Sequence, residues 1–257
     1  MVNVFRYCLF DLLRSRWSVV YTVFYLICAS ALLHFSNSPS NAVASLMNIV
    51  LFITPLVSML LGIIYFYQNR EFAELMLSQP IKRVHFFLGN YLGLNASMIL
   101  SLLIGLGVPA LVFGWNYIGQ LGILLTSGIL LSLIFSALAL WISLQNENRI
   151  KGFGMAILTW LFFAIIYDGL FLILLLWFSD YPLENAALIA TLFNPIDLGR
   201  VLILLQLDLS ALLGFTGASF KHFLGSSVGI VVALMTAVLW VIVPLGILLR
   251  KGNRKDF

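Results

Sequence analysis

The sequence predicts an all-α integral membrane protein with six transmembrane helices, an interfacial helix before the first of them and a short cytoplasmic helix after the second. Composition is the first reason, because 62% of the residues are hydrophobic and only 9% are charged. Soluble domains carry roughly 25% charged residues. The second reason is that long apolar runs alternate with short polar segments. The third is the uneven placement of Lys and Arg.

Twelve of the fourteen Lys and Arg residues lie in four polar segments that alternate with the apolar runs. Basic flanks resist translocation, so these segments, and with them both ends of the chain, are expected in the cytoplasm. The net charge of +4 therefore belongs to membrane flanks, and no nucleic-acid partner is implied. The four segments hold Arg6, Arg14 and Arg16; Arg70, Lys82 and Arg83; Arg149 and Lys151; and Arg250, Lys251, Arg254 and Lys255.

The first element is an amphipathic helix over residues 3–15. Phe5, Leu9, Leu12 and Leu13 fall on one stripe of this helix, and the basic residues fall mostly off it. Such a helix lies in the membrane interface, here along the inner leaflet.

Six spans follow within a single transmembrane domain, 1–257. A bilayer core needs about 20 apolar residues in helical form, and backbone groups in lipid must be hydrogen-bonded within their own segment. Gly89 and Gly93 lie four residues apart in the third span and would permit a close helix contact. The spans are expected at 17–35, 43–67, 87–113, 119–144, 153–178 and 226–249.

The polar segment 68–86 connects the second and third spans. Phe72, Leu75 and Met76 share one helical face and Glu71 and Glu74 lie on the adjacent face. Pro80 ends the helix. A helix with two acids and a basic exit suits docking to a soluble subunit, although a solvated helix that touches only lipid headgroups has the same pattern.

No P-loop motif G-x-x-x-x-G-K-[ST] occurs, because none of the lysines follows a glycine. ATP hydrolysis would have to come from another polypeptide. We therefore expect no catalytic residues and no cofactor bound directly to this chain.

The segment 71–83 resembles the E-x-G-T-L-x-x-L-L-x-x-P…R signature of type 2 ABC exporter permeases, in which it forms the coupling helix seated on the ATPase. Glu71, Leu75, Leu77, Pro80 and Arg83 match its outline. The sequence Phe-Ala-Glu at 72–74 departs from the usual Gly-Thr. By this resemblance Glu71, Glu74, Leu75, Pro80 and Arg83 are the residues expected to couple to the ATPase.

Two further segments narrow the resemblance to the NosY-type permeases, which take part in the maturation of nitrous oxide reductase. They are Tyr-Asp-Gly-Leu at 167–170 and Asn-Pro-Ile-Asp-Leu-Gly-Arg at 194–200. The resemblance extends over nearly the whole chain.

Asp168 is an ionisable residue well inside the fifth span. It lies about 15 residues beyond Phe153, or roughly 22 Å along a helix, which places it in the outer half of the bilayer. A carboxylate there is costly unless it is protonated, paired or facing water, so a functional role is the first hypothesis. The alternative is a buried structural acid bonded to a neighbouring helix.

The outer connection 179–225 contains a helix start. Asn194 and Asp197 are placed to cap and begin the helix, Pro195 lies in its first turn, and Arg200 shares a face with Asp197. We expect these four residues to hold an outer gate or a periplasmic partner, with simple interfacial packing as the alternative. The pattern leaves open whether 196–209 is interfacial or re-entrant.

The resemblance implies a homodimer in the bacterial inner membrane, two ATPase subunits that are NosF-like, and a periplasmic NosD-like partner received by 180–225. The implied cargo is a sulfur species or copper for assembly of the reductase copper centre. No metal site is expected, because Cys8, Cys28 and the three histidines, His34, His85 and His222, are dispersed. Sulfur therefore fits better than bare copper.

Two rival functions remain. One is a type 2 permease for another cargo, such as a lipid or a peptide, which the neighbouring genes would distinguish. The other is an intramembrane enzyme or a passive scaffold. Ser219 and His222 could form a protease dyad, but nothing in the pattern aligns them on spans.

Overall fold

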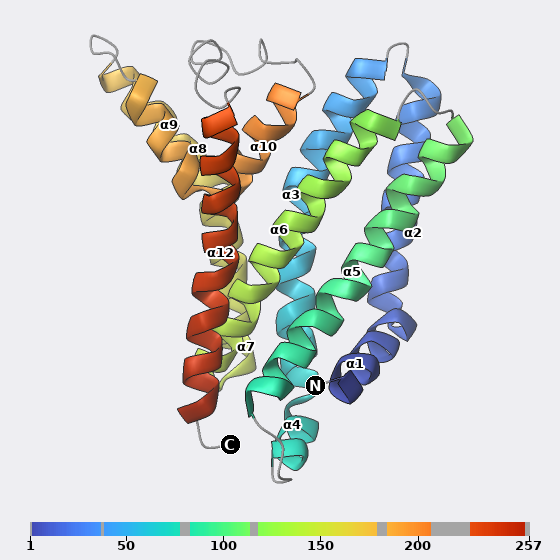
Figure 1. Ribbon diagram of the computed structural model, residues 1–257, viewed down its shortest axis with the longest axis vertical. Coiled ribbons are helices and arrows are strands. Elements are labelled where there is room, and N and C mark those ends of the chain that lie inside the picture. Colours follow the sequence, from blue (N-terminus) through green and yellow to red (C-terminus); the bar gives the residue numbers. More distant parts are fainter. Residues whose placement is uncertain are drawn as a thin grey trace.

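The computed structural model describes residues 2–36, 39–77, 83–113, 118–178, 184–206 and 227–254, and these ranges contain helices and no strand (Figure 1). The predicted all-α class is confirmed. The elements are α1 (Val2–Arg14), α2 (Arg16–Phe35), α3 (Pro39–Gln68), α4 (Arg70–Leu77), α5 (Arg83–Phe113), α6 (Ile118–Gln145), α7 (Arg149–Leu161), the π-helical turn η2 (Phe162–Ile166), α8 (Tyr167–Trp177), α9 (Glu184–Phe193), α10 (Pro195–Gln206) and α12 (Ser227–Arg254).

Six helices are long and apolar enough to cross a membrane, as predicted. Each begins or ends within a few residues of the expected bounds, and the fifth is a composite of α7, η2 and α8. The two ends of the chain lie at the same end of the molecule (Figure 1), as an even number of spans requires. The six ranges are Arg16–Phe35, Asn41–Gln68, Arg83–Phe113, Gly119–Gln145, Arg149–Leu174 and Val231–Gly252.

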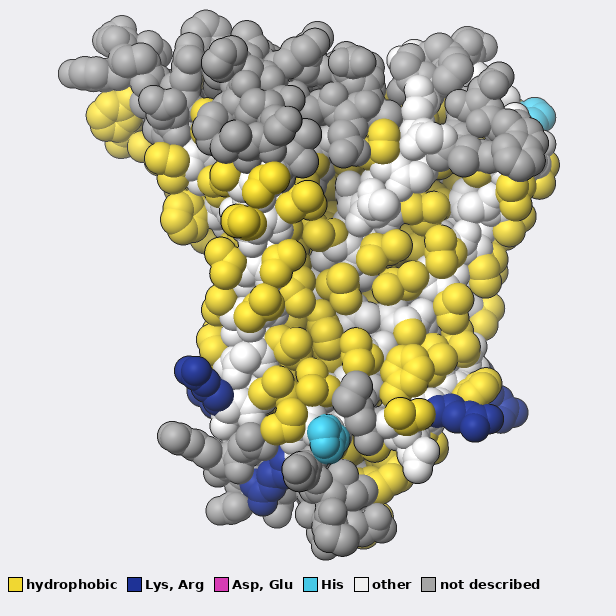
Figure 2. All heavy atoms as spheres, in the orientation of Figure 1, with side chains coloured by type: hydrophobic (Ala, Val, Ile, Leu, Met, Phe, Trp, Pro, Cys, Tyr) yellow, Lys and Arg dark blue, Asp and Glu magenta, His cyan; other side chains and the backbone are white. Residues whose placement is uncertain are grey.

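The surface has the pattern of a membrane protein. In Figure 2 a broad band of hydrophobic side chains covers the middle of the visible face, and Lys and Arg side chains lie at its lower margin, toward the end that holds both termini. That margin is where basic flanks are expected to meet lipid headgroups.

α1 is held by protein contacts as well as by its amphipathic pattern. Val4 and Cys8 are buried against α5, where a Cβ at Gly93 would lie 2.6 Å from the Cys8 sulfur and one at Gly89 would lie 2.9 Å from Val4. The two glycines therefore make the close contact that their spacing predicts. The buried face runs through Val4, Cys8 and Leu12, one position away from most of the predicted stripe, because α1 docks on the glycine groove of α5. Burial also raises the pKa of the Cys8 thiol to about 12.

Buried polar side chains join the spans. The hydroxyls of Tyr25 and Thr54 lie 2.8 Å apart between α2 and α3, and Ser136 of α6 donates to the Asn95 side chain of α5 at 3.0 Å. Hydrogen bonds between membrane helices contribute about 0.6 kcal/mol each on average. The four spans α2, α3, α5 and α6 thus pack together, and α7, α10 and α12 lie against them.

Gly93→Ala is expected to destabilise the protein, whereas Gly107→Ala on the same helix is not. A methyl group at Gly93 overlaps Cys8, and such overpacking costs about 1 to 3 kcal/mol. Nothing lies within 4 Å of a Cβ at Gly107, where alanine gains about 1 kcal/mol of helix propensity. Thermal unfolding of both purified variants in the same detergent measures the difference, and equal midpoints would contradict the docking of α1 on α5.

Candidate functional site

The described part of the connection 179–225 is a helical hairpin. α9 and α10 are separated by Asn194 and are bent by 118° relative to each other. Figure 1 shows both helices at the end of the molecule opposite the termini: α9 descends from that end, and α10 returns to it. A bend of this kind occurs in a broken span or in a re-entrant loop, and the return of α10 to the end from which α9 descends favours the re-entrant alternative that the sequence left open. Residues 207–226, the rest of the connection, lie outside the described part of the chain.

Asn194 organises the apex of this hairpin. Its side-chain oxygen accepts from the backbone N–H of Ile196 at 3.0 Å, and its carbonyl accepts from Leu198 at 2.9 Å, so Asn194 caps α10 with Pro195 in the first turn. Its amide nitrogen donates to Asp197 Oδ2 at 2.7 Å. Asn194 is fully buried, and these contacts explain how a polar side chain is accommodated there.

The same amide nitrogen donates to the carbonyl oxygen of Phe163, in η2, at 2.9 Å. In this turn the Tyr167 N–H reaches back five residues to Phe162. Such a π-turn interrupts the α-helical hydrogen-bond register and makes a backbone carbonyl available to a side chain. The Tyr167 hydroxyl adds a second link by donating to the carbonyl of Ala190 at 2.7 Å. Span five and the hairpin are thus joined on both sides of the apex.

Ion pairs complete the junction. Arg200 Nη1 donates to Asp168 Oδ2 at 3.0 Å and lies 2.9 Å from Asp197 Oδ1. The contact with Asp197 is an ion pair without hydrogen-bond geometry, which leaves Oδ1 of Asp197 as a buried acceptor that receives no hydrogen bond. The side chains of Arg200 and Asp168 are 31% and 30% exposed. We call Asp168, Asn194, Asp197 and Arg200 the hairpin lock.

The hairpin lock brings together two features that the sequence analysis predicted separately, namely the acid in span five and the helix start at 194–200. Asp168 lies in the candidate span Arg149–Leu174, six residues from its end, or about 9 Å along the helix. The structural alternative was an acid bonded to a neighbouring helix, and the observed partner is Arg200 of α10. One Arg between two Asp leaves a formal charge of −1. Because charged groups at this depth are rarely exposed to lipid, the exposed edge of the lock is expected to face water or protein.

The coupling segment forms a separate site at the opposite end of the molecule. α4 is a helix, as the pattern predicts, and Leu75 on it is 68% exposed. The ring of Phe72 stacks on Tyr7 of α1 with centroids 4.9 Å apart. Arg83 begins α5. The side chains of Glu71 and Glu74 and all of Pro80 lie outside the described part of the chain.

A further group of residues, which the sequence analysis did not predict, connects the junction of α3 and α4 to the start of span five. The Tyr67 hydroxyl donates to the carbonyl of Asn146 at 2.6 Å, and Arg70 Nη1 donates to the carbonyl of Glu147 at 3.3 Å. A Cβ at Gly152 would overlap the Tyr67 hydroxyl, so this position requires glycine. We call Tyr67, Arg70 and Gly152 the loop clamp. The acceptors of the loop clamp are backbone carbonyls, which any residue type supplies, so no sequence motif predicts these contacts.

Span five therefore carries a fixed point at each end. The loop clamp holds the loop at 146–148 that leads into α7, and the hairpin lock holds α8. Between these two points span five is largely exposed in the single chain, because only 6% of its most apolar 18-residue window is buried.

Two relatives bear on the function of this arrangement. The chain is 28% identical over 221 residues to a protein of Pseudomonas aeruginosa, in an alignment that covers 78% of this chain and 80% of the relative. It is also 28% identical over 263 residues to a protein of Stutzerimonas stutzeri, covering 93% of this chain and 90% of the relative. Both relatives are named "Probable ABC transporter permease protein NosY". No family model matches the chain.

Proposed function

We propose that this NosY-like permease subunit of an ABC transporter moves a sulfur species across the membrane for assembly of the copper centre of nitrous oxide reductase. The similarity to two ABC transporter permeases over most of the chain supports the transporter role. The resemblance of 167–170 and 194–200 to NosY-type permeases supports the link to the reductase. The observation that carries the mechanism is that span five is fixed at one end to the coupling corner and at the other to the hairpin lock.

The proposed assembly is a homodimer in the bacterial inner membrane, with two NosF-like ATPase subunits below it and a NosD-like protein on the periplasmic side. Closure of the ATPases on ATP displaces α4. The loop clamp passes this displacement to α7 because Tyr67 and Arg70 hold the loop at 146–148. Movement of α8 then strains the pair between Asp168 and Arg200, and the hairpin swings as the outer gate.

The ligand chemistry favours sulfur over copper as the cargo. Copper(I) selects thiolate and thioether ligands, whereas the lock offers carboxylate oxygens, an amide and a guanidinium. Cys8 is buried against α5, and Cys28 lies apart from it on α2. A neutral or anionic sulfur species needs no such ligands, and the residues of the lock would gate its passage rather than bind it.

Transport into inside-out proteoliposomes that contain the permease with its ATPase tests this function directly. Radiolabelled sulfide or persulfide should accumulate only with ATP and not with a hydrolysis-deficient ATPase. Accumulation of copper instead of sulfur would overturn the cargo. ATP-dependent movement of a labelled lipid or peptide, without either, would establish the rival type 2 permease.

The proposed orientation predicts the pattern of cysteine labelling in intact cells. Single cysteines at Asn37, Asn116 and Asn185 should react with an impermeant maleimide. Those at Asn3, Gln68, Asn146 and Asn253 should react only after permeabilisation. A background with Cys8 and Cys28 replaced by Ser provides the control. External labelling at Asn146 would invert the topology and place the loop clamp outside.

A further inference from the structure

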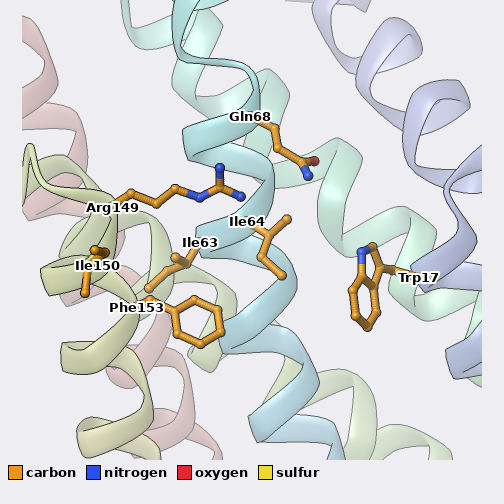
Figure 3. Close-up of a pocket in the computed structure, with 7 residues that line it drawn as sticks. All are labelled: Trp17, Ile63, Ile64, Gln68, Arg149, Ile150 and Phe153. Carbon is orange, nitrogen blue, oxygen red and sulfur yellow. The ribbon is translucent and has the colours of Figure 1, made fainter.

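A groove crosses α3 between α2 and α7, close to the loop clamp. It holds about 360 Å³ and lies where three spans reach the same membrane surface, since the first begins at Arg16, the second ends at Gln68 and the fifth begins at Arg149. In Figure 3 Trp17 and Phe153 stand on opposite sides of α3, with Ile64 between them.

The walls and the rim of the groove differ in chemistry. Trp17, Ile63, Ile64 and Phe153 supply an apolar surface, and Trp17 is 55% exposed although it is a large aromatic residue. At the rim, Arg149 extends from α7 across the face of α3, and Gln68 stands at the end of α3 (Figure 3). A cation and an amide above an apolar slot match the phosphate and acyl chain of a lipid.

A second hollow of about 250 Å³ adjoins the groove and shares Trp17, Ile64 and Gln68 with it. Its other lining residues include Asp11, Arg14 and Ser15, so it is a polar compartment with both signs of charge. A free inorganic anion would use the rim alone and leave the apolar walls empty. The pair of compartments has the division of a phospholipid, with an acyl part, a phosphate and a polar headgroup.

We propose that this groove binds one glycerophospholipid of the cytoplasmic leaflet. Its phosphate accepts hydrogen bonds from Arg149 and Gln68, an acyl chain lies on Ile64 between Trp17 and Phe153, and the headgroup enters the hollow beside Asp11 and Arg14. The assignment to the cytoplasmic leaflet rests on the proposed orientation. The lipid lies across α3 between α2 and α7, beside the start of span five, and protein flanks it on both sides, which distinguishes it from the annular lipid.

Quenching of tryptophan fluorescence by brominated lipid tests the site. The full-length chain, delipidated in detergent, is titrated with phosphatidylglycerol or phosphatidylethanolamine that carries brominated acyl chains, and Trp17→Phe identifies the Trp17 signal. Arg149→Gln should weaken saturable Trp17 quenching about tenfold, because it removes a charged hydrogen-bond donor. Arg250→Gln, an exposed arginine at the same end of the molecule, should leave the affinity unchanged.

Three results would overturn the proposal. Equal loss in the Arg149 and Arg250 variants would indicate unspecific attraction between lipid and basic flanks. Protection of the site by millimolar inorganic phosphate as effective as that by lipid would identify an anion site. Ile150 also lines the groove and is 81% exposed. Ready disulfide formation between copies that carry Ile150→Cys, abolished by neither lipid nor dilution, would show that a second copy fills the groove. The measurement needs neither ATP nor cargo, so its outcome is independent of the proposed transport.

Discussion

Arg200→Met is expected to destabilise the protein by about 2 to 3 kcal/mol and, on the proposed function, to abolish maturation of nitrous oxide reductase. The substitution keeps an unbranched apolar stem but leaves Asp168 and Asp197 without a counter-charge at membrane depth. Removal of one partner from a buried ion pair costs 3 to 5 kcal/mol, and the partial exposure of the lock reduces that figure. Thermal unfolding in detergent measures the first effect, and the copper-centre absorption of the reductase measures the second.

A double-mutant cycle distinguishes a lock from two independent residues. If Asp197 and Arg200 act as a unit, Asp197→Asn with Arg200→Met should be little worse than Arg200→Met alone. Both should lose the periplasmic partner yet retain the ATPase. Arg250→Met, outside the lock, is the matched control. The three lock variants are Asp197→Asn, Arg200→Met and the double variant. Additive effects of the two single changes, or partner binding and maturation that survive in all three lock variants, would mean that the segment is only a packed membrane helix.

Asp168→Asn isolates the charge on span five. The amide still accepts a hydrogen bond from Arg200 and is cheaper in the membrane than a carboxylate, so the fold should persist. Transport should fail if the charge itself serves the gate. Normal maturation in this variant would assign Asp168 a packing role only.

Local patterns were sufficient for the elements and insufficient for their junctions. The six spans, α1, α4 and the cap at Asn194 follow from runs, stripes and capping residues, which are properties of neighbours in the chain. The pair Asp168 and Arg200 joins positions 32 residues apart, and Tyr67 meets Asn146 across 79. Such contacts depend on how helices are arranged, and no periodicity encodes them.

The π-turn η2 shows the same limit on a smaller scale. Phe-Phe-Ala-Ile-Ile at 162–166 carries neither Pro nor Gly, so the sequence reads as uninterrupted helix. The carbonyl of Phe163 in this turn accepts a hydrogen bond from the Asn194 amide, which lies outside the segment. Asn194 was predicted as a cap from its neighbours, whereas its second partner required knowledge of the fold.

Charge reversal on α4 and removal of one hydroxyl from the loop clamp should have different effects on the ATPase. Glu71→Lys and Glu74→Lys should weaken ATPase association about tenfold each, because a like charge replaces an attractive one at a polar interface. Asp256→Lys is the control for a charge reversal on the same predicted membrane side. Association is measured by co-purification and by titration of the labelled ATPase onto the reconstituted permease.

Tyr67→Phe should leave ATPase association intact and uncouple hydrolysis from transport. The change removes only the hydroxyl that donates to Asn146, a loss on the order of 1 kcal/mol, so the helices remain in place. With only the longer bond from Arg70 to Glu147 left, α7 follows α4 less closely, and the hairpin lock opens less often for each ATP hydrolysed. The ratio of cargo moved to ATP hydrolysed should therefore fall, whereas Glu71→Lys should lower both quantities together. An unchanged ratio in Tyr67→Phe would mean that the displacement reaches span five by another route, and retention of normal ATPase binding in Glu71→Lys and Glu74→Lys would remove α4 as the docking element.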